Sequence, residues 1–386
     1  MSEIVITGLG AVCRLGTGVD AFWNGVMAAR TAEPDRVPDE RAEVPLPLYY
    51  MVPGRSAVHA GGPASEFTVA AGEEAAADGR VGEVDPYRVA VLMGSSVGDA
   101  RQTELARAGE APAVTGGSPP FSMASALAAR IGPCAGAVSL SNACSGSGYA
   151  IAMGAEMIEA GEADVVIAGG VEAYSRVTIA AFNRMGALGP ERPRPFDKGR
   201  QGVVLGEGAG AVVLESAAHA AARGARAYAR LAGSGWSCDA AHPTAPDPSG
   251  TQIKRAMRDA LTQAGAGPED VSFIVPHATG TTLNDSTEAT AMADAFGDRL
   301  AEIPLHNLKA IIGHLAGGAG VMGTILAALA FHHGEIPPNP PLREPDPECP
   351  VHLPTGITPL DGGVALVNSY AFGGNNISLA LQGVAA

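Results

Sequence analysis

The chain has 386 residues, of which 46% are apolar, and its formal net charge is −15. This length predicts two domains or one large duplicated unit. The acidic balance argues against nucleic acid as a partner, because binding to phosphates needs a basic surface.

The five cysteines are scattered, and none of them lies in a CxxC or Cys/His metal spacing. We therefore expect reduced thiols in a cytoplasmic protein, with neither a disulfide framework nor a metal site. The first residues lack the basic and apolar segments of a signal peptide. Residues 310–334 contain no Asp, Glu, Lys or Arg. Their glycines and histidines favour a glycine-rich turn and a buried helix over a membrane span.

The first half alternates apolar runs with helical patterns. A predicted strand at 4–7 precedes Gly8-Leu9-Gly10, which half-resembles a dinucleotide-binding fingerprint, although Cys13 stands where the third glycine would be. Beyond it we predict helices at 22–29, 66–78, 123–130 and 149–158, strands at 88–93, 137–140, 164–170 and two within 201–215, and loops at 31–64 and 109–120.

The second half repeats this rhythm from about Ala217. We predict helices at 251–264, 286–295 and 319–331, and strands at 271–275, 303–305, 363–368 and 377–381. The shared layout indicates an internal duplication. Strands that are apolar throughout and alternate with helices predict a parallel-rich sheet that is covered on both faces.

Cys144 lies in a turn of small residues between a predicted strand and a predicted helix. The N-terminus of a helix carries partial positive charge and free N–H groups, which favour a thiolate and offer oxyanion donors. Most single cysteines are simply buried, so partners elsewhere in the chain decide whether this sulfur is a nucleophile.

Two histidines, His277 and His314, also follow predicted strands and precede a helix or a glycine-rich turn. Catalytic groups in α/β sheets collect at the carboxyl ends of strands. One cysteine with two such histidines suggests nucleophilic acyl transfer. We assign six other histidines to the core or the surface: His59, His219, His306, His332, His333 and His352.

Several motifs have spacings that are specific as a set. They are Val5-Ile-Thr-Gly-Leu-Gly-Ala-Val, Asn142-Ala-Cys-Ser-Gly, Val166-Ile-Ala-Gly-Gly-Val-Glu172, Arg194-Pro-Phe-Asp197, Gly206-Glu-Gly-Ala-Gly210, His277-Ala-Thr-Gly-Thr281 with Asp285 and Glu288, Lys309-x-x-x-Gly-His314, and Asn368-Ser-x-x-Phe372-Gly-Gly. With them the chain resembles the elongating β-ketoacyl-acyl carrier protein synthases of the thiolase superfamily.

The resemblance implies a thiolase-like α/β fold, in which two duplicated βαβαβαββ halves form a five-layered αβαβα core. The first half, 1–216, would carry Cys144. The second half, 217–386, would carry His277 and His314.

The resemblance also implies the chemistry. Cys144 would take an acyl chain as a thioester, and a malonyl unit on an acyl carrier protein would then lose CO2 and condense with it. His277 and His314 would stabilise the enolate oxygen, and Lys309 would orient His314. The backbone N–H groups of Cys144 and Phe372 would form the oxyanion hole. Donors already aimed at a developing anion need no reorganisation, and losing one typically costs on the order of 10²–10³ in rate.

Other roles follow from the same resemblance. Phe372 would gate the acyl pocket, Thr279 and Thr281 would bind the phosphopantetheine arm that the carrier delivers, and Thr244 would line the malonyl pocket. No further cofactor and no metal are implied. Because carrier proteins are acidic, docking needs a local basic patch. The densest one contains Arg192, Arg194, Lys198 and Arg200, with Arg194 at a position that contacts the carrier in relatives.

The sequence departs from the family at three places. Ala278 replaces a glycine after the first histidine, and Gly323 replaces a glutamate that lies near the lysine in relatives. The chain is shortened before Pro119, in a region that contributes to the dimer interface in relatives. The shortening and Gly323 favour a specialised polyketide or polyene pathway over fatty acid synthesis. We expect a dimer, either of two copies or with a chain-length-factor subunit.

Three other readings compete. A non-catalytic chain-length partner would lack Cys144, and an enzyme that only transfers or hydrolyses the acyl group would not need Lys309 and both histidines. A dinucleotide oxidoreductase rests only on Gly8 and Gly10, and no acidic residue follows a second strand at the right distance.

Overall fold

The computed structural model describes residues 3–29, 31–37, 39, 41, 44–45, 47–54, 62–111 and 122–384. His59, Pro119 and parts of the predicted loops at 31–64 and 109–120 lie outside these ranges.

The strands are β1 (Ile4–Cys13), β2 (Gly16–Thr17), β3 (Asp35–Arg36), β4 (Leu48–Tyr50), β5 (Val89–Gly94), β6 (Gly136–Leu140), β7 (Val165–Glu172), β8 (Leu205–Gly206), β9 (Gly208–Ser216), β10 (Ala229–Cys238), β11 (Val271–Val275), β12 (Glu335–Ile336), β13 (Thr358–Pro359), β14 (Val364–Tyr370) and β15 (Asn375–Gly383).

The α-helices confirm the predicted ones to within a few residues and add others. They are α1 (Val19–Met27), α2 (Pro63–Asp78), α3 (Ala100–Arg107), α4 (Ser122–Ile131), α5 (Gly146–Glu159), α6 (Arg176–Arg184), α7 (Ala217–Ala222), α8 (Thr251–Gln263), α9 (Thr282–Phe296), α10 (Lys309–Ile312) and α11 (Ala319–His333).

The two halves have the same strand order. In the first half the order is β6-β5-β7-β9-β1, which is third, second, fourth, fifth and first along the chain. In the second half the order is β11-β14-β15-β10, and Leu305 adds a parallel bridge to Ile274 beside β11, where the third strand is expected. The antiparallel pair β1–β10 joins the halves. The order and the directions therefore repeat, as a duplicated unit requires.

The prediction of a parallel-rich sheet is wrong. Only the pairs β5–β6, β5–β7 and β11–β14 of the large sheet are parallel. The last strand of each half, β9 or β15, runs antiparallel to both of its neighbours. For β15 the reason is local: only four residues, 371–374, connect it to β14, and a parallel connection needs a crossover of a dozen residues or more.

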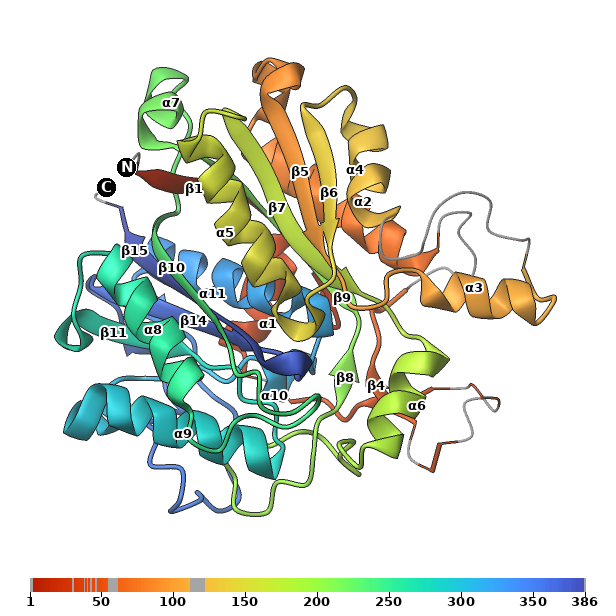
Figure 1. Ribbon diagram of the computed structural model, residues 1–386, viewed down its shortest axis with the longest axis vertical. Helices are drawn as coiled ribbons and strands as arrows, with labels where there is room; N and C mark the ends of the chain where they lie inside the picture. Colours follow the sequence, from red (N-terminus) through yellow and green to blue (C-terminus); the bar gives the residue numbers. More distant parts are fainter. Residues whose placement is uncertain are drawn as a thin grey trace.

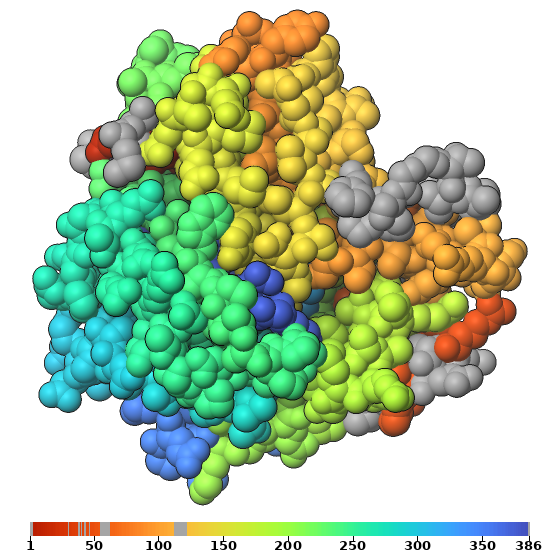
Figure 2. All heavy atoms as spheres, viewed as in Figure 1, coloured from red at the N-terminus to blue at the C-terminus, as the bar shows by residue number. Residues whose placement is uncertain are grey.

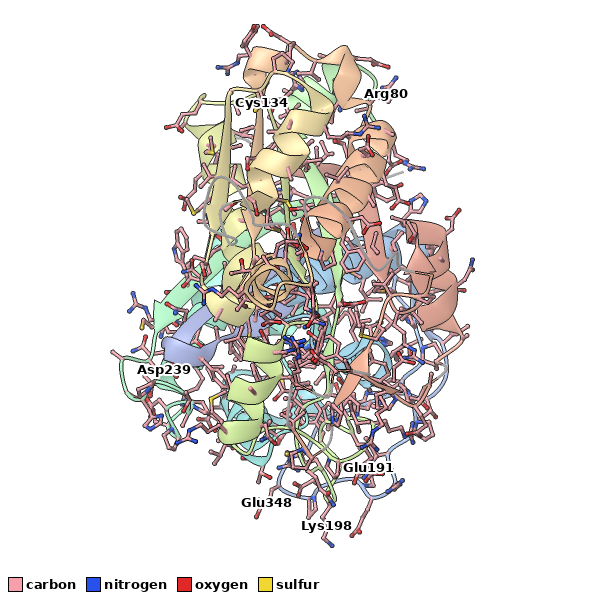
Figure 3. The ribbon with its side chains drawn as sticks, turned by 90° about the vertical axis from the view of Figure 1, so that its right-hand side faces the viewer. Arg80, Cys134, Glu191, Lys198, Asp239 and Glu348 are labelled. Atoms are coloured by element: carbon pink, nitrogen blue, oxygen red, sulfur yellow. The ribbon has the colours of Figure 1, made fainter. Side chains whose placement is uncertain are left out.

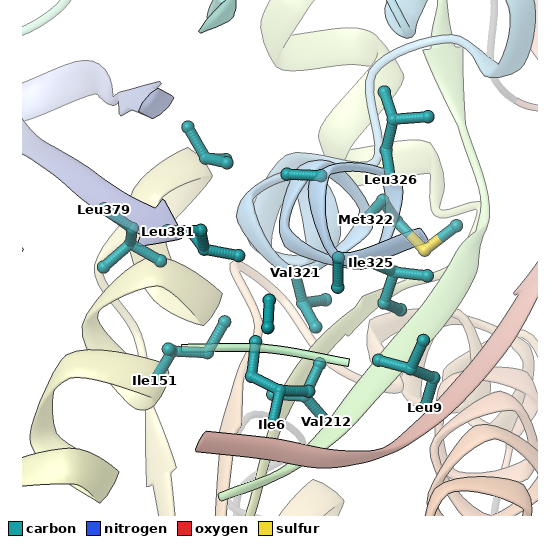
Figure 4. Close-up of a cluster of buried hydrophobic side chains, with 14 of the residues drawn as sticks. Ile6, Leu9, Ile151, Val212, Val321, Met322, Ile325, Leu326, Leu379 and Leu381 are labelled. Carbon is teal, nitrogen blue, oxygen red and sulfur yellow. The ribbon is translucent and has the colours of Figure 1, made fainter. Parts of the chain in front are cut away.

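Helices α5 and α11 lie between the strands of the two halves (Figure 1). The side chains of α11 face Ile6, Leu9 and Val212 of the first half and Leu379 and Leu381 of the second half (Figure 4). Helices α2 and α4 cover the outer face of the first half, and α8 covers that of the second. This arrangement agrees with the predicted five layers.

Helix α11 also confirms the buried helix that was predicted within residues 310–334, because every residue from Gly320 to Ala330 is buried. Within the described ranges, no helix has the length and apolar character needed to cross a membrane.

Strand β1 continues through Gly8 and Gly10 without a turn, so the interpretation as a dinucleotide fingerprint is wrong. A Cβ atom on Gly8 would lie 2.3 Å from the carbonyl oxygen of Ala75, and one on Gly10 would lie 1.9 Å from that of Ala71. These glycines therefore let α2 pack directly on the strand, which is a common use of glycine within a strand.

Candidate active site

Cys144 lies where the sequence predicted it, in a single 3₁₀ turn, Ala143–Ser145, between β6 and α5. The residue is 6% exposed. The turn fits under the sheet because of small residues: a Cβ atom on Gly94 would lie 2.3 Å from the carbonyl carbon of Gly146. The end of β5 thus touches the start of α5, and the sulfur is fixed by backbone packing.

His314 comes from the second half but is held by the first half. Its N–H donates to the carbonyl of Val204 at 2.9 Å, and its carbonyl accepts from the N–H of Gly206 at 3.0 Å. Its Nε2 lies 3.1 Å from the Cys144 Sγ. His314 follows α10 and Gly313 rather than a strand, so that part of the prediction is wrong: its extended pairing is with residues near β8, far away in sequence.

His277 follows β11 by two residues, as predicted. The carboxylate of Glu288 accepts the N–H groups of His277 and Ala278, each at 2.7 Å. The imidazole is 5.3 Å from that of His314 between ring centroids, with the rings nearly perpendicular. Ala278 has a φ of 39°, a left-handed conformation that strains an L-residue and that the glycine expected from the resemblance would adopt freely.

One cavity of about 350 Å³ brings most of the predicted residues together. Its lining includes Cys144, His277, His314, Thr244, Thr279, Thr281 and Phe372. These residues come from both halves. The turn that carries Phe372 follows β14, and Figure 2 shows this part of the chain, in dark blue, at the centre of the visible face.

Lys309 lies outside the cavity lining. It is buried, and its Nζ donates to the carbonyl of His277 at 2.5 Å. The structure therefore places Lys309 on the His277 backbone, although it was expected to orient His314. Burial lowers the pKa of Lys309 to about 8 and raises that of Glu288 to about 7, and each charge partly opposes the shift of the other.

Burial opposes the Cys144 thiolate that the helix N-terminus was predicted to favour. Burial raises the pKa of this thiol to about 12. The positive charge of Lys309 and the N–H groups of Cys144 and Phe372 act in the opposite direction, but desolvation is the larger effect. Burial also lowers the pKa of both His277 and His314 well below 6.5, with Lys309 adding to the effect. The resting site thus pairs a neutral thiol with a neutral imidazole.

The predicted basic patch is wrong for Arg194 and Arg200. Arg194 is 6% exposed and pairs with Glu191 at 2.5 Å, and Arg200 is buried against Asp346. A buried guanidinium that already has a carboxylate partner is not available to a carrier at the surface. Lys198 does point outward at the edge of the molecule, but it pairs with Glu344 (Figure 3).

Comparisons with known proteins agree with this geometry. The model of the Beta-ketoacyl synthase, N-terminal domain, matches residues 51–220, and that of the Beta-ketoacyl synthase, C-terminal domain, matches residues 228–343. The chain belongs to the β-ketoacyl synthase family.

Similar proteins extend over nearly all of the chain. Nodulation protein E of Rhizobium meliloti is 34% identical over 412 residues, which is 99% of each chain. The 3-oxoacyl-[acyl-carrier-protein] synthase 2 of Synechocystis sp. is 32% identical over 406 residues, 98% of each. The solved structure of the ishigamide ketosynthase/chain length factor has a TM-score of 0.90 and 34% identity, and the match covers 100% of each chain. The protein is thus an acyltransferase with a thiolase-like fold, of the condensing type that serves fatty acid or type II polyketide synthesis.

The structure explains how this synthase accommodates Gly323. A Cβ atom there would lie 2.8 Å from Cγ1 of Val367 and 3.2 Å from Cγ1 of Val275. The two valine side chains occupy the space beside Gly323, so a glutamate side chain would not fit there unless they moved. Among the groups acting on the charge of Lys309, the carboxylates are Glu288 and Asp285.

Two contacts of the synthase site have no sequence signal. The ring of Phe182, on α6, lies 5.4 Å from the ring of Phe372, and both side chains line the cavity. The side chain of His242 accepts the backbone N–H groups of Thr244 and Ala245. Helix α6 was not predicted at all, and single residues that touch only in the folded chain leave no pattern to read.

Proposed function

We propose that this synthase catalyses the decarboxylative condensation of a Cys144-bound acyl group with a malonyl-acyl carrier protein, giving a β-ketoacyl-acyl carrier protein and CO2. The observation that carries the proposal is the 3.1 Å approach of His314 Nε2 to the Cys144 sulfur, in one cavity with His277. The phosphopantetheine arm of the carrier supplies the reacting thioester, and no other cofactor is proposed.

In the first step the thiol proton of Cys144 passes to Nε2 of His314 as the sulfur attacks the acyl thioester carbonyl. A neutral imidazole can accept this proton, whereas an imidazolium cannot. The new C–S bond replaces the bond to the donor thiol, which leaves with the proton returned by His314. Proton transfer by a positioned imidazole of this kind is typically worth about 10²–10⁴ in rate.

In the second step the malonyl thioester loses CO2, and the electrons of the broken C–C bond move to its carbonyl oxygen. We assign His277 and His314 as donors to this oxygen. Neither Nδ1 atom has a hydrogen-bond partner in the part of the chain that is described. No partner of Nδ1 in the described residues therefore fixes the tautomer of either ring. Nε2 of His314 can accept the thiol proton in the first step and, after a change of tautomer, donate in the second.

The enolate carbon then attacks the acyl carbonyl on Cys144, and the sulfur leaves as a thiolate that takes up a proton. We propose the N–H groups of Cys144 and Phe372 as the oxyanion hole for both tetrahedral intermediates. Support comes from their effect on the sulfur, because both N–H groups lower the pKa of the Cys144 thiol. Thr244, Thr279 and Thr281 have hydroxyls along the cavity that suit the amides of a phosphopantetheine arm.

We propose that the carrier docks at the mouth of the cavity, around α6 and the start of α9. Met185 and Leu283 line the cavity and are 39% and 62% exposed, so they stand at its opening. Arg184, in the last turn of α6, is exposed, and no ion pair within the described ranges includes it. An unpaired cation next to apolar side chains suits an acidic carrier, whereas the net charge of −15 repels one elsewhere.

We further propose that the synthase works as a dimer in a specialised polyketide or polyene pathway, in the cytoplasm. Strand β6 is the edge of the large sheet, and Val138 on it is 41% exposed. An exposed apolar edge is a ready surface for a second chain. The similarity to a ketosynthase that is solved with a chain length factor favours a homologous partner of that kind over a second copy.

The test is intact-mass analysis of the purified protein with an acyl donor, then with malonyl-carrier, with and without candidate partner subunits. We expect an acyl adduct on Cys144 and then release of CO2 and a β-ketoacyl carrier. The Cys144→Ala variant should lose the adduct, whereas Cys238→Ala, at an exposed thiol, should keep it. An adduct that forms without any condensation, whichever subunit is added, would favour the alternative of an acyl-transfer-only partner.

A further inference from the structure

Glu172, the last residue of β7, is a buried carboxylate that the steps above do not use. It is 1% exposed and lies outside the cavity lining. It accepts the N–H groups of Ser96, Val97 and Gly317 at 2.8, 3.1 and 3.1 Å, and the hydroxyl of Ser95 at 3.1 Å. Among the described residues four donors and no acceptor face it, which is the pattern that satisfies an ionised carboxylate. Burial raises the pKa of Glu172, and the N–H groups of Ser96, Gly317 and Val97 oppose that rise.

These donors belong to different halves of the molecule. Ser95, Ser96 and Val97 form the loop after β5, and the N–H of Ser95 bonds the carbonyl of Leu140, at the end of the strand before Cys144. Gly317 lies three residues after His314. A Cβ atom on Gly317 would be 2.6 Å from Cα of Ser95, so the two loops are in direct backbone contact.

We propose that Glu172 is a positioning residue for the condensation, whose carboxylate holds the turn behind His314 against the loop beside Cys144. The inference rests on the proposed function, because it concerns the approach of that imidazole to that sulfur. Glu172 touches neither reacting atom. Its effect acts through Gly317 on one side and through Ser95 to Val97 on the other.

The charge of Glu172 makes this role separable from mere structural support. Lys309 and Glu172 act on the Cys144 thiol through their charges, and His314 and His277 share its cavity. The two imidazoles are neutral, Lys309 lowers the pKa of the thiol, and Glu172 raises it. Removing the negative charge should therefore favour the thiolate, while removing the hydrogen bonds should loosen the turn behind His314. Alkylation and condensation should respond in opposite directions.

The experiment compares Glu172→Gln and Glu172→Asp with the wild type. For each, the rate of Cys144 alkylation by iodoacetamide is measured against pH by mass spectrometry, together with single-turnover condensation. We expect Glu172→Gln to alkylate about threefold to tenfold faster at a given pH, because a like charge near the thiol is gone. Its condensation should fall about tenfold. Glu172→Asp keeps the charge but shortens the reach, so its alkylation profile should not move while its condensation falls.

Glu207→Gln is the matched control. Glu207 is equally buried, lies just before β9 and accepts the N–H groups of Val52 and Tyr174, but it is not among the groups acting on the charge of Cys144. Its alkylation profile should stay unchanged. The proposal is overturned if Glu172→Gln leaves both profile and condensation unchanged, or if Glu207→Gln shifts alkylation equally. If Glu172→Gln does not fold, Glu172→Asp decides: full condensation in it would overturn the role.

If the wild-type protein forms no acyl adduct on Cys144, the proposed function itself is refuted. That outcome differs from every outcome that would overturn the role of Glu172.

Discussion

The two halves share a topology but hold their proposed catalytic groups in different ways. Backbone packing positions Cys144, because Gly94 lets two main-chain segments touch and the turn has small residues throughout. Buried charges position His277, because Glu288 accepts two N–H groups and Lys309 bonds the carbonyl of the same histidine. The activity should therefore be sensitive to side-chain volume in the first half, which carries Cys144 and is called the nucleophile half. It should be sensitive to charge in the second half, which carries His277 and is called the histidine half.

The contact between the halves at His314, called the seam, depends on both backbone packing and side-chain chemistry. His314 belongs to the second half by sequence but has its backbone paired to Val204 and Gly206 of the first. The Cys144–His314 distance is thus set across the seam. Changes in charge should therefore matter most near His277, and changes in volume should matter most near Cys144 and at the seam.

The largest effect is expected for Glu288→Ala in the histidine half. The change leaves two buried N–H groups without their acceptor. It also removes the negative charge that stabilises the protonated form of Lys309. Removing one partner of a buried charged network typically costs about 3–5 kcal/mol of stability. Urea unfolding should show this loss, and condensation should fall by a factor on the order of 10² or more, as for a lost electrostatic donor. Glu156→Gln, on the outer face of α5, should stay within about 0.5 kcal/mol of the wild type.

A pH series probes the nucleophile half without a mutation. Because burial raises the pKa of Cys144 to about 12, the thiolate is a small fraction at neutral pH and grows with every unit. We expect the iodoacetamide alkylation rate of Cys144 to rise about tenfold per pH unit between roughly pH 8 and 10, as for any group well below its pKa. A plateau of the rate near neutral pH would mean that the helix N-terminus outweighs burial after all.

The sequence predicted the elements that have strong patterns and missed those without them. Strand β11 and helices α4 and α11 are apolar runs with clear ends, and the structure confirms them. Helix α3 is largely polar, and β10 alternates buried with partly exposed residues among glycines and serines, so neither has an apolar run. The parallel sheet was inferred from apolar strands, but those strands are buried because helices cover them, whatever their direction.

The site was predictable where motifs carry it. Cys144, His277, His314 and Phe372 were placed by the family resemblance that the motifs carry, and the structure brings them to one cavity. The protonation state of Cys144 was not predictable, because a sequence shows the helix N-terminus but not how little water reaches the sulfur. For the same reason Arg194 read as a surface cation: its burial depends on Glu191 and on packing that only the fold creates.

A smaller effect is expected from Gly170→Ala, at the seam on strand β7. A Cβ atom there would lie 2.6 Å from the carbonyl oxygen of Gly317 and 2.6 Å from Cβ of Ser147. Overpacking of this kind costs about 1–3 kcal/mol. Because it pushes against the turn behind His314, condensation should fall about tenfold, since a misplaced reacting group can cost up to about 10²-fold. Gly82→Ala, which faces open space, is the volume-matched control. Equal rates in the two variants would contradict the sensitivity to volume.

The smallest effect concerns His242, in the loop that carries Thr244. Its Nδ1 accepts the N–H groups of Thr244 and Ala245 at 3.1 and 3.0 Å, as the oxygen of an Asx turn would. The same loop bonds the turn that carries Phe372, because the N–H of Gly373 donates to the carbonyl of Pro243. Each exposed bond is worth only about 0.5–1.5 kcal/mol. His242→Ala should therefore raise KM for malonyl-carrier a few-fold, by roughly the value of one such bond, and leave acylation of Cys144 unchanged. His242→Asn supplies an acceptor in the same place and should restore KM, whereas His352→Ala, remote from the loop, should change neither step. If the alanine and asparagine variants behave alike, the loop is held by its other bonds, and the histidine half owes its order to the buried charges alone.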